Sequence, residues 1–310
     1  MGSVVNLGVF VADTAYRAQR MPKLGETVLG KSFVLGPGGK GSNQSVASAM
    51  AGAQTHFISR LGQDDFAEMA LATWRAAGVT PAVVQDPTSY TGAAFIFVED
   101  ATGNNAIIIS PGAAAQISTG DVDRNRALIE GADVFITQLE QPIDVAFYAL
   151  KLARAAGVTT ILNPAPAATL PEGMLAVCDY VTPNETEAEA LTGLSVTDPE
   201  TALAAAKVLR TLGAKVAIIT LGAQGVLYHD GVQTVHVPIV TAGPVVETTG
   251  AGDAFNGGLA AALAEGQGPV AAVRFGNATA GISVTRPGTA PSMPARAEID
   301  ALLAKSPGET

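Results

Sequence analysis

Short runs of nearly continuous apolar residues alternate along the chain with longer, alanine-rich segments. Such runs are typical of strands that helices cover on both faces, because these strands have no polar side. The predicted strands are Val4–Val11, Thr55–Ser59, Val134–Thr137, Val158–Leu162 and Val216–Leu221. The predicted helices are Ser45–Ala51, Phe66–Ala77, Val145–Ala156 and Ala202–Leu212. Because a glycine follows each of the last three, the pattern predicts an α/β fold, with a doubly wound, mainly parallel sheet flanked by helices.

Two regions interrupt this alternation. Glu26–Leu35, and the pair Ala93–Val98 and Ala106–Ser110, resemble strands with no helix between them. Strands inserted at about residues 13–37 and 91–111 predict a small β-sheet lid beside the main sheet. Apolar faces and free edges on such a lid would favour pairing with a second subunit.

The composition fits a folded chain with a large core. Of the 310 residues, 48% are hydrophobic and 15% are charged, against an ordinary charged share of roughly a quarter. The net charge of −10 and the scattered basic residues offer no footprint for nucleic acid or an anionic membrane. The single cysteine, Cys178, cannot form an intrachain disulfide, which fits a reducing compartment. We therefore expect one domain over residues 1–310, located in the cytoplasm, with neither nucleic acid nor membrane as partner.

Two glycine-rich matches are rejected as nucleotide motifs because of their context. Gly25–Ser32 fits the P-loop pattern, but the segment reads as strand, whereas a P-loop follows a buried strand and opens a helix. Gly36–Gly41 fits the dinucleotide pattern GxGxxG, but Arg60 and Leu61 stand where an acidic residue is required. Flexible loop glycines are the simpler interpretation, and an NAD-dependent oxidoreductase is disfavoured.

The segment from Glu247 to Gly258 carries the most informative chemistry. Gly250 and Gly252 allow backbone amides to converge at the start of an Ala/Leu-rich helix, which makes an anion site. Asp253 could there accept the proton of an attacking hydroxyl while the amides stabilise a transferring phosphoryl group. A simple helix cap is the alternative and, for this residue alone, the commoner explanation.

Two further segments offer groups for a sugar and a nucleotide. Gly38–Asn43 precedes a helix and provides bare amides, an ammonium and a carboxamide, which suit a polyhydroxylated ligand; a glycine hinge with solvated Lys40 is the alternative. Asn184 and Glu187 are three residues apart on one helical face, where they could orient hydrated Mg²⁺ beside a triphosphate. Helix capping combined with surface charge explains that pair equally well in isolation.

Taken together, these loops resemble those of the ribokinase family of sugar and nucleoside kinases. The resemblance runs almost from end to end, and independent loops match in order at family-like spacing. The matching segments are Pro22–Gly30, Gly38–Asn43, Gln138–Glu140, Asn163–Ala167, Thr182–Gly193, Thr220–Gly225, Thr249–Gly258 and Val284–Gly288. The resemblance implies a ribokinase-like fold and an ATP-dependent kinase that transfers the γ-phosphoryl group to a sugar hydroxyl.

The resemblance also implies roles for individual residues. Asp253 corresponds to the catalytic base, and the anion hole corresponds to the amides of Gly250, Ala251 and Gly252. The positions implied at the sugar are Val11, Asp13, Gly39, Lys40, Gly41, Asn43 and Glu140. The positions implied at ATP are Asn184, Thr220, Gly222, Gly225, Gly252 and Asn277.

Metal ions and a partner subunit are implied as well. Glu187 corresponds to a residue that holds Mg²⁺ through water. A site for a monovalent cation, usually K⁺, corresponds to Glu247, Thr249, Ser283, Arg286, Gly288 and Ser292. The family usually has aspartate where this chain has Glu247. The lid is implied to close over the sugar and to pair two chains into a homodimer.

One departure from the family concerns the sugar itself. Ribose-specific members carry asparagine two residues before the sugar-binding aspartate, whereas this chain has Val11. Valine cannot bond a hydroxyl, and a buried hydroxyl without a partner costs about 1–3 kcal/mol. Ribose, giving the 5-phosphate, is the expected substrate; 2-deoxyribose, a ketose such as fructose, a modified sugar or a nucleoside is the alternative. A sugar-binding protein without catalysis is the alternative from a different class.

Overall fold

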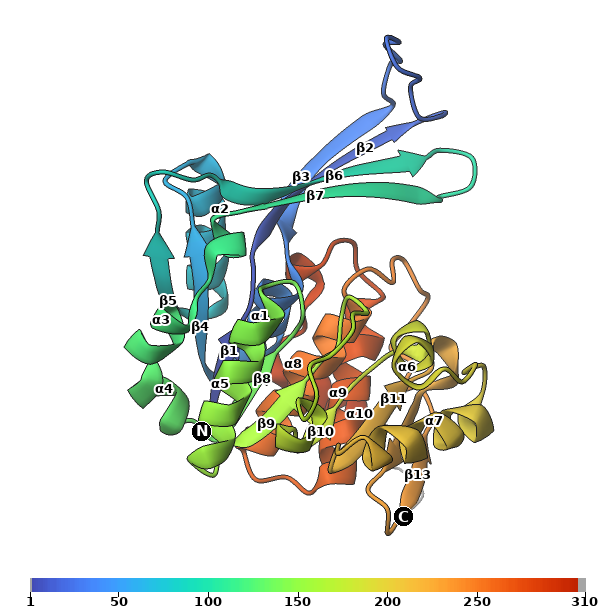
Figure 1. Cartoon of the computed structure of the whole chain (residues 1–310). Helices are drawn as coiled ribbons and strands as arrows, with labels where there is room; N and C mark the ends of the chain where they lie inside the picture. Colours follow the sequence, from blue (N-terminus) through green and yellow to red (C-terminus); the bar gives the residue numbers. More distant parts are fainter. Residues whose placement is uncertain (1, 306–310) are drawn as a thin grey trace.

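The computed structural model describes residues 2–305 and has a nine-stranded sheet at its centre (Figure 1). In sheet order the strands are β13 (Thr234–Val237), β12 (Val226–His229), β11 (Val216–Thr220), β10 (Tyr180–Val181), β9 (Thr159–Leu162), β8 (Val134–Thr137), β1 (Ser3–Leu7), β4 (Gln54–Leu61) and β5 (Thr80–Gln85). Neighbouring strands are parallel from β11 to β5, and only the β11–β12 and β12–β13 pairs are antiparallel. The prediction of a mainly parallel sheet is therefore confirmed. Residues 1 and 306–310 of the predicted domain lie outside the described residues.

Helices cover both faces of this sheet. They are α1 (Lys40–Met50), α2 (Asp65–Ala77), α3 (Thr119–Arg124), α4 (Arg126–Glu130), α5 (Ile143–Ala155), α6 (Glu185–Thr192), α7 (Pro199–Thr211), α8 (Ala251–Ala264), α9 (Pro269–Ser283) and α10 (Arg296–Lys305). Successive side chains of a strand point to opposite faces, so β8 contributes Phe135 to the core under α5 and α7, and Val134 and Ile136 to the core under α8 and α9. In the part of the chain described, every helix is too short or too polar to cross a bilayer.

A second sheet of four strands projects from the body, as Figure 1 shows, and we call it the lid. Its order is β3 (Ser32–Gly38), β2 (Val11–Ala18), β6 (Thr91–Glu99) and β7 (Asn105–Gly112). β2 and β6 are parallel, while β3 and β7 pair antiparallel at the edges. The small additional sheet expected from the sequence is thus confirmed.

Several predicted boundaries are wrong. The strand predicted over Val4–Val11 is two strands, because the chain leaves the main sheet at Gly8 and enters the lid as β2. The strand predicted over Glu26–Leu35 is a loop as far as Lys31, where the Glu26 carboxylate accepts the Lys23 N–H at 3.0 Å and pairs with Arg20, which holds a turn. The short strands β5 and β10 were not predicted.

The two rejected motifs have different contexts. Gly25–Ser32 runs through the loop into β3, so no helix follows it, unlike a P-loop. The glycines of Gly36–Gly41, however, are not in a flexible loop as expected. Gly39 caps α1 with a φ of 87°, and a Cβ there would lie 2.5 Å from the Val9 carbonyl oxygen. The close approach of two backbones therefore requires glycine at this position.

Candidate active site

The predicted site residues lie mainly in segments that follow the carboxyl ends of parallel strands. Glu140 follows β8 and Asn184 follows β10, while Thr220 is the last residue of β11. Ligands of open α/β sheets bind in the crevice at this edge. A cavity of about 160 Å³ is found here, lined by Lys40, Asn163, Ala165, Thr182, Asn184, Glu187, Thr220, Gly250, Gly252, Asp253 and Asn256.

The start of α8 forms one wall of the cavity. Gly250 caps the helix with a φ of 80°, and the first N–H groups of a helix have no partner within it, so they can bind an anion. A Cβ on Gly250 would lie 3.3 Å from Thr289. The cap is Gly250, not Asp253, so the helix-cap alternative for Asp253 is wrong.

The Asp253 carboxylate is buried and bound by two amides. Its Oδ2 accepts from Asn43 Nδ2 at 2.9 Å, and its Oδ1 accepts from Gln44 Nε2 at 3.0 Å. Burial raises the pKa of Asp253, while the Lys40 charge and the two amides act against this rise. A carboxylate with a raised pKa accepts a proton more readily, which suits a general base.

Lys40 lines the cavity, and its backbone binds Glu140. The backbone N–H of Lys40, in the first turn of α1, donates to Glu140 Oε2 at 2.8 Å. Burial raises the pKa of Glu140 to about 7, although the Lys40 charge and N–H act against it. Burial would lower the pKa of Lys40, but the charges of Asp253, Glu140 and Glu187 outweigh it and raise that pKa. Lys40 therefore stays cationic among the acidic groups and is not the solvated lysine of the alternative.

The lid contributes Asp13 and Val11, which lie two residues apart on one face of β2. They pair with Gly36 and Gly38 of β3, and a Cβ on Gly38 would lie 2.2 Å from Asp13 Oδ2. Burial, together with the charge of Asp253, raises the pKa of Asp13 to about 6. Asp13 of the lid and Asp253, the predicted base, are thus close enough to interact electrostatically.

The predicted nucleotide residues lie beyond Asp253, along the ends of β10 and β11. Asn184 and Glu187 cap α6 reciprocally: Asn184 Oδ1 accepts from Glu187 N at 2.8 Å, and Glu187 Oε2 accepts from Asn184 N at 2.9 Å. Thr220 forms a bridge to Asn184, and Asn277 of α9 donates to the Pro238 carbonyl at 2.8 Å. The capping part of the alternative is therefore confirmed, but its surface-charge part is wrong for Glu187, which is buried. Glu187 Oε1 is not used by the cap and is left for another contact.

The residues predicted to bind a monovalent cation lie in two stretches of chain that meet, residues 247–249 and residues 283–292, the second of which begins at the last residue of α9. Glu247 Oε2 accepts from Gly288 N at 2.8 Å, and Glu247 N donates to the Val284 carbonyl at 3.2 Å. The Arg286 guanidinium instead pairs with Glu298, so only its backbone is left for an ion. Among the described residues, no group of three or more His, Cys, Asp or Glu could hold a metal.

Sequence reasoning missed the polar residues behind Asp253. Asn6, Gln44, Gln138, Asn163 and Thr182 are all buried and linked by hydrogen bonds. Asn6 lies inside an apolar run that predicts a buried strand. Because a buried polar side chain requires a hydrogen-bond partner, its position could have predicted a buried polar contact. The others became visible only when the fold brought their segments together.

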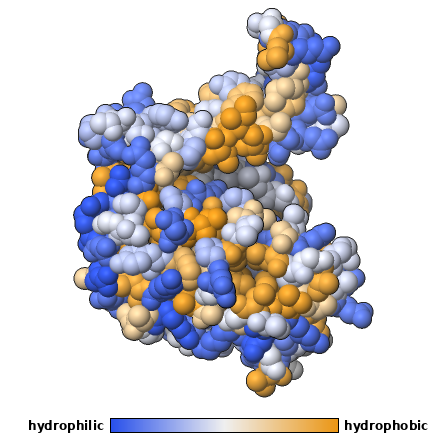
Figure 2. Space-filling view, viewed as in Figure 1, coloured by the Kyte–Doolittle hydropathy of each residue, from blue (hydrophilic) through white to orange (hydrophobic). Residues whose placement is uncertain are grey.

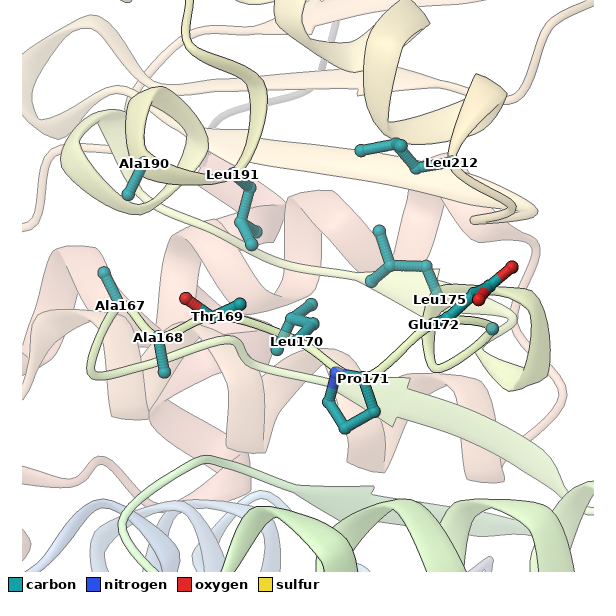
Figure 3. A pocket seen from close by; sticks show the side chains of 11 residues that line it. Ala167, Ala168, Thr169, Leu170, Pro171, Glu172, Leu175, Ala190, Leu191 and Leu212 are labelled. Carbon is teal, nitrogen blue, oxygen red and sulfur yellow. The ribbon is translucent and has the colours of Figure 1, made fainter.

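A larger hollow of about 530 Å³ lies elsewhere. Figure 3 shows it between the loop after β9, the side chains of Ala190 and Leu191 on α6, and Leu212 at the end of α7. Its lining includes none of the predicted site residues. Among the described residues that line it, only Glu172 is charged. Convergent polar groups, rather than volume, identify the smaller cavity as the candidate active site.

Comparison with known proteins identifies the family of the chain. The family model of the pfkB family carbohydrate kinases matches residues 1–296, and the chain belongs to that family. Ribokinase of Haemophilus influenzae is 38% identical over 294 residues, covering 94% of this chain and 95% of that protein. Deoxyribokinase of Salmonella typhi is 34% identical over 290 residues, covering 93% and 94%. The solved structure of Arabidopsis thaliana ribokinase complexed with ribose and ATP matches with a TM-score of 0.91 and 32% identity, covering 98% and 99%.

These matches confirm three predictions: the ribokinase-like fold, the resemblance itself, and an ATP-dependent sugar kinase. The roles of individual residues are a separate matter, because similarity of whole chains does not test them.

Proposed function

We propose that this carbohydrate kinase transfers the γ-phosphoryl group of ATP to the 5-hydroxyl of ribose. The observation that carries the proposal is the buried Asp253 carboxylate, beside the amides at the start of α8 and facing the charges of Asp13 and Lys40. The Ala251 amide also donates to the Thr248 carbonyl at 3.1 Å. The similar ribokinase of Arabidopsis thaliana, solved with ribose and ATP, supports the choice of both substrates.

In this proposal Asp253 takes the proton of the sugar hydroxyl as its oxygen attacks the γ-phosphorus. The bond from that phosphorus to the oxygen of the departing ADP breaks, and the amides of Gly250, Ala251 and Gly252 stabilise the charge on the transferring group. The Lys40 ammonium lies near enough to lower the pKa of Asp253, so it also favours negative charge here. Position and electrostatics supply the catalysis, as phosphoryl transfer requires.

At the sugar end, Asp13 accepts bonds from two hydroxyls, and Gly39, Lys40, Gly41, Asn43 and Glu140 complete the pocket. Asn43 Oδ1 supports this role, because it is buried with no hydrogen-bond partner among the described residues. An unpaired buried acceptor is costly, and a sugar hydroxyl would satisfy it.

At the nucleotide end, Asn184, Thr220, Gly222, Gly225, Gly252 and Asn277 bind ATP. Glu187 holds Mg²⁺ through water, since its second carboxylate oxygen is not used by the cap and hard cations prefer oxygen ligands. The ion neutralises charge on the phosphates. We also propose a site for a monovalent cation beside the anion hole, where the segments of Glu247 and Gly288 meet.

A second substrate, 2-deoxyribose, is favoured by one observation. Val11 is only 5% exposed and shares a strand face with Asp13, so it offers an apolar surface where a hydroxyl would need a partner. The similarity to a deoxyribokinase agrees with this possibility. Values of kcat/KM for ribose, 2-deoxyribose and fructose decide the matter: a clear preference for ribose supports the first proposal, and a preference for 2-deoxyribose replaces it. Absence of sugar-dependent ADP release with every sugar would instead indicate a non-catalytic binding protein.

We further propose that the whole chain works as one domain in the cytoplasm and pairs with a second copy through the lid. Apolar side chains are exposed there, among them Phe33 at 53% and Ile108 at 64%, and Tyr16 packs on Phe33 with ring centroids 4.9 Å apart. Figure 2 shows apolar surface on the lid above the body. Light scattering should give the mass of a dimer, and Phe33→Asp with Ile108→Asp should give a monomer.

A further inference from the structure

Gln44 contacts the predicted base from the side that no substrate can reach. It lies on α1 and is fully buried. Its Nε2 donates both to Asp253 Oδ1 and to Asn163 Oδ1, each at 3.0 Å, while its Oε1 accepts from Gln138 Nε2 at 2.6 Å. The polar atoms of this side chain are all used within the protein, so Gln44 acts on the reaction through its partners, of which Asp253 is the proposed base.

The orientation of Gln44 is set by neighbours on one side. A carboxamide keeps its shape when turned by 180°, so its partners decide which end is nitrogen. Asn6 Nδ2 donates to the Gly41 carbonyl at 3.0 Å, and a carbonyl can only accept. Asn6 must therefore present its oxygen to Gln138, whose nitrogen donates to it at 3.0 Å and also to Gln44 Oε1. Gln44 is left with its nitrogen facing Asp253.

The other side imposes the same orientation. Asn163 Nδ2 donates to the Thr182 carbonyl at 3.0 Å, so Asn163 turns its oxygen toward Gln44 and requires a donor there. A row of four carboxamides, Asn6, Gln138, Gln44 and Asn163, thus runs between two backbone carbonyls. We call it the amide row. Because both of its ends are backbone acceptors, no member can flip without losing hydrogen bonds in a buried site.

We propose that the amide row keeps Asp253 ionised and correctly oriented as the base, with Gln44 as the positioning residue. Two fixed N–H donors, from Gln44 and Asn43, occupy one site on each carboxylate oxygen. Each oxygen can accept a second bond, so a site remains for the sugar proton. A protonated carboxyl accepts the N–H groups of Gln44 and Asn43 more weakly than an ionised carboxylate does, which favours the charged form. This inference rests on the proposed role of Asp253.

Other charged groups also face Asp253 and have to be separated from the effect of the amide row. Lys40 of α1 lowers its pKa, whereas Asp13 of β2, Glu140 after β8 and Glu187 of α6 are acidic groups coupled to it. A pH profile of kcat reports apparent pKa values of such a group as a whole. The informative quantity is therefore the difference between each variant and the unchanged enzyme.

The direct test is Gln44→Glu, which keeps the shape but replaces the donor by an oxygen facing Asp253. Two carboxylates this close cannot both ionise easily, so the acid limb of the kcat profile should move to higher pH by about one unit or more. At neutral pH kcat should fall about tenfold, and part of it should return at higher pH. KM for the sugar should change less than kcat. A purely structural role predicts a lower melting temperature with an unmoved acid limb, which would overturn the proposal.

A second variant keeps the test valid if Gln44→Glu does not fold. Gln138 makes no hydrogen bond with Asp253 in the described structure. In Gln138→Glu, however, the ionised side chain can only accept hydrogen bonds. Gln44 would then have to turn its nitrogen toward residue 138 and its oxygen toward Asp253. We expect a shift of the acid limb in the same direction, of about half a unit. Gln141→Glu is the matched control: Gln141 is also buried, and its amide donates to Thr137 Oγ1 and the Gln138 carbonyl, outside the amide row. An equal shift in this control would contradict the proposal.

Asp253→Asn, measured in the same series, separates the two levels of the argument. If Asp253→Asn keeps its activity, the proposed base is wrong. If Asp253→Asn is inactive while Gln44→Glu and Gln138→Glu keep the original profile, the base is correct and the amide row does not orient it.

Discussion

Two buried aspartates at opposite edges of the main sheet show how surroundings divide structural from chemical roles. Asp253 is 8% exposed and lies at the carboxyl edge, whereas Asp179 is 6% exposed and directly precedes β10 at the amino edge. Burial alone would raise the pKa of Asp179, but the Thr160 N–H and the charges of Arg154 and Lys215 lower it. Asp253 has only amides and one lysine against its burial, and its pKa is raised. Two carboxylates of similar solvent exposure therefore differ in role, because Asp179 has strong partners and Asp253 lies deeper with weaker ones, which leaves it ready to accept a proton.

The strongest test of this comparison removes the base. Asp253→Asn preserves shape but cannot take the sugar proton, so kcat should fall by at least about a hundredfold while ATP binding stays similar. A coupled assay of ADP formation measures the first quantity, and calorimetry with a non-hydrolysable ATP analogue measures the second. Activity within a few-fold of the original would exclude Asp253 as the base.

The matched change at the other edge should act on stability instead. Asp179→Asn leaves Arg154 and Lys215 without their buried partner, which typically costs about 3–5 kcal/mol for a buried pair; both cations are partly exposed here, so we expect about 1–3 kcal/mol. Urea unfolding should show this loss, and kcat should stay within about twofold. A large loss of kcat in a folded Asp179→Asn protein would contradict the division of roles.

The pH dependence of stability should also have opposite signs at the two edges. A carboxyl whose folded pKa is raised stabilises the protein when protonated. For Glu140, raised from 4.5 to about 7, the free energy of unfolding should therefore fall as pH rises from about 4.5 to 7, by about 3 kcal/mol at most. The lowered pKa of Asp179 acts the other way, and its contribution is lost as the pH falls through that pKa. Urea unfolding of Glu140→Gln at several pH values tests the prediction for Glu140. The free energy of unfolding of this variant should not show the Glu140 contribution to the fall between about pH 4.5 and 7.

The smallest expected effect concerns Val11, the apolar residue on the same face of β2 as Asp13. Val11→Asn supplies a partner for a sugar hydroxyl, which is worth about 1 kcal/mol or more, so kcat/KM for ribose relative to 2-deoxyribose should rise about fivefold to tenfold. Val11→Ala is the control, because it changes size without adding polarity. A similar ratio in Val11→Asn and Val11→Ala would show that Val11 does not sense that hydroxyl.

The sequence was most informative where chemistry is local. Gly250 and Asp253 lie within one turn of a helix, so their pattern alone suggested an anion site with a carboxylate, and the cavity contains both. Runs such as Val134–Thr137 coincide with β8 because a strand buried on both faces needs an unbroken apolar segment.

What could not be predicted depends on contacts that are distant in sequence. Gln44 adjoins Asn43, yet its partner Asp253 is 209 residues away. Its orientation is decided by the Gly41 carbonyl of its own helix and by the Thr182 carbonyl after β10, both acting through side chains from other elements. The loop at Glu26 was mistaken for a strand because its residues favour extended structure, whereas the ion pair with Arg20 and the bond to Lys23 hold a turn. No periodicity in the sequence records such contacts.

The close approach of Gly38 to Asp13 limits how the preference for a sugar can change. Any side chain at position 38 would have to displace the Asp13 carboxylate, so a substitution there would disturb the acid itself. Val11 pairs with the same glycine and has a side chain that can be exchanged. We therefore expect the preference for the sugar that accepts the phosphoryl group to change through mutations at position 11. Position 38 should remain glycine, because it leaves room for the Asp13 carboxylate.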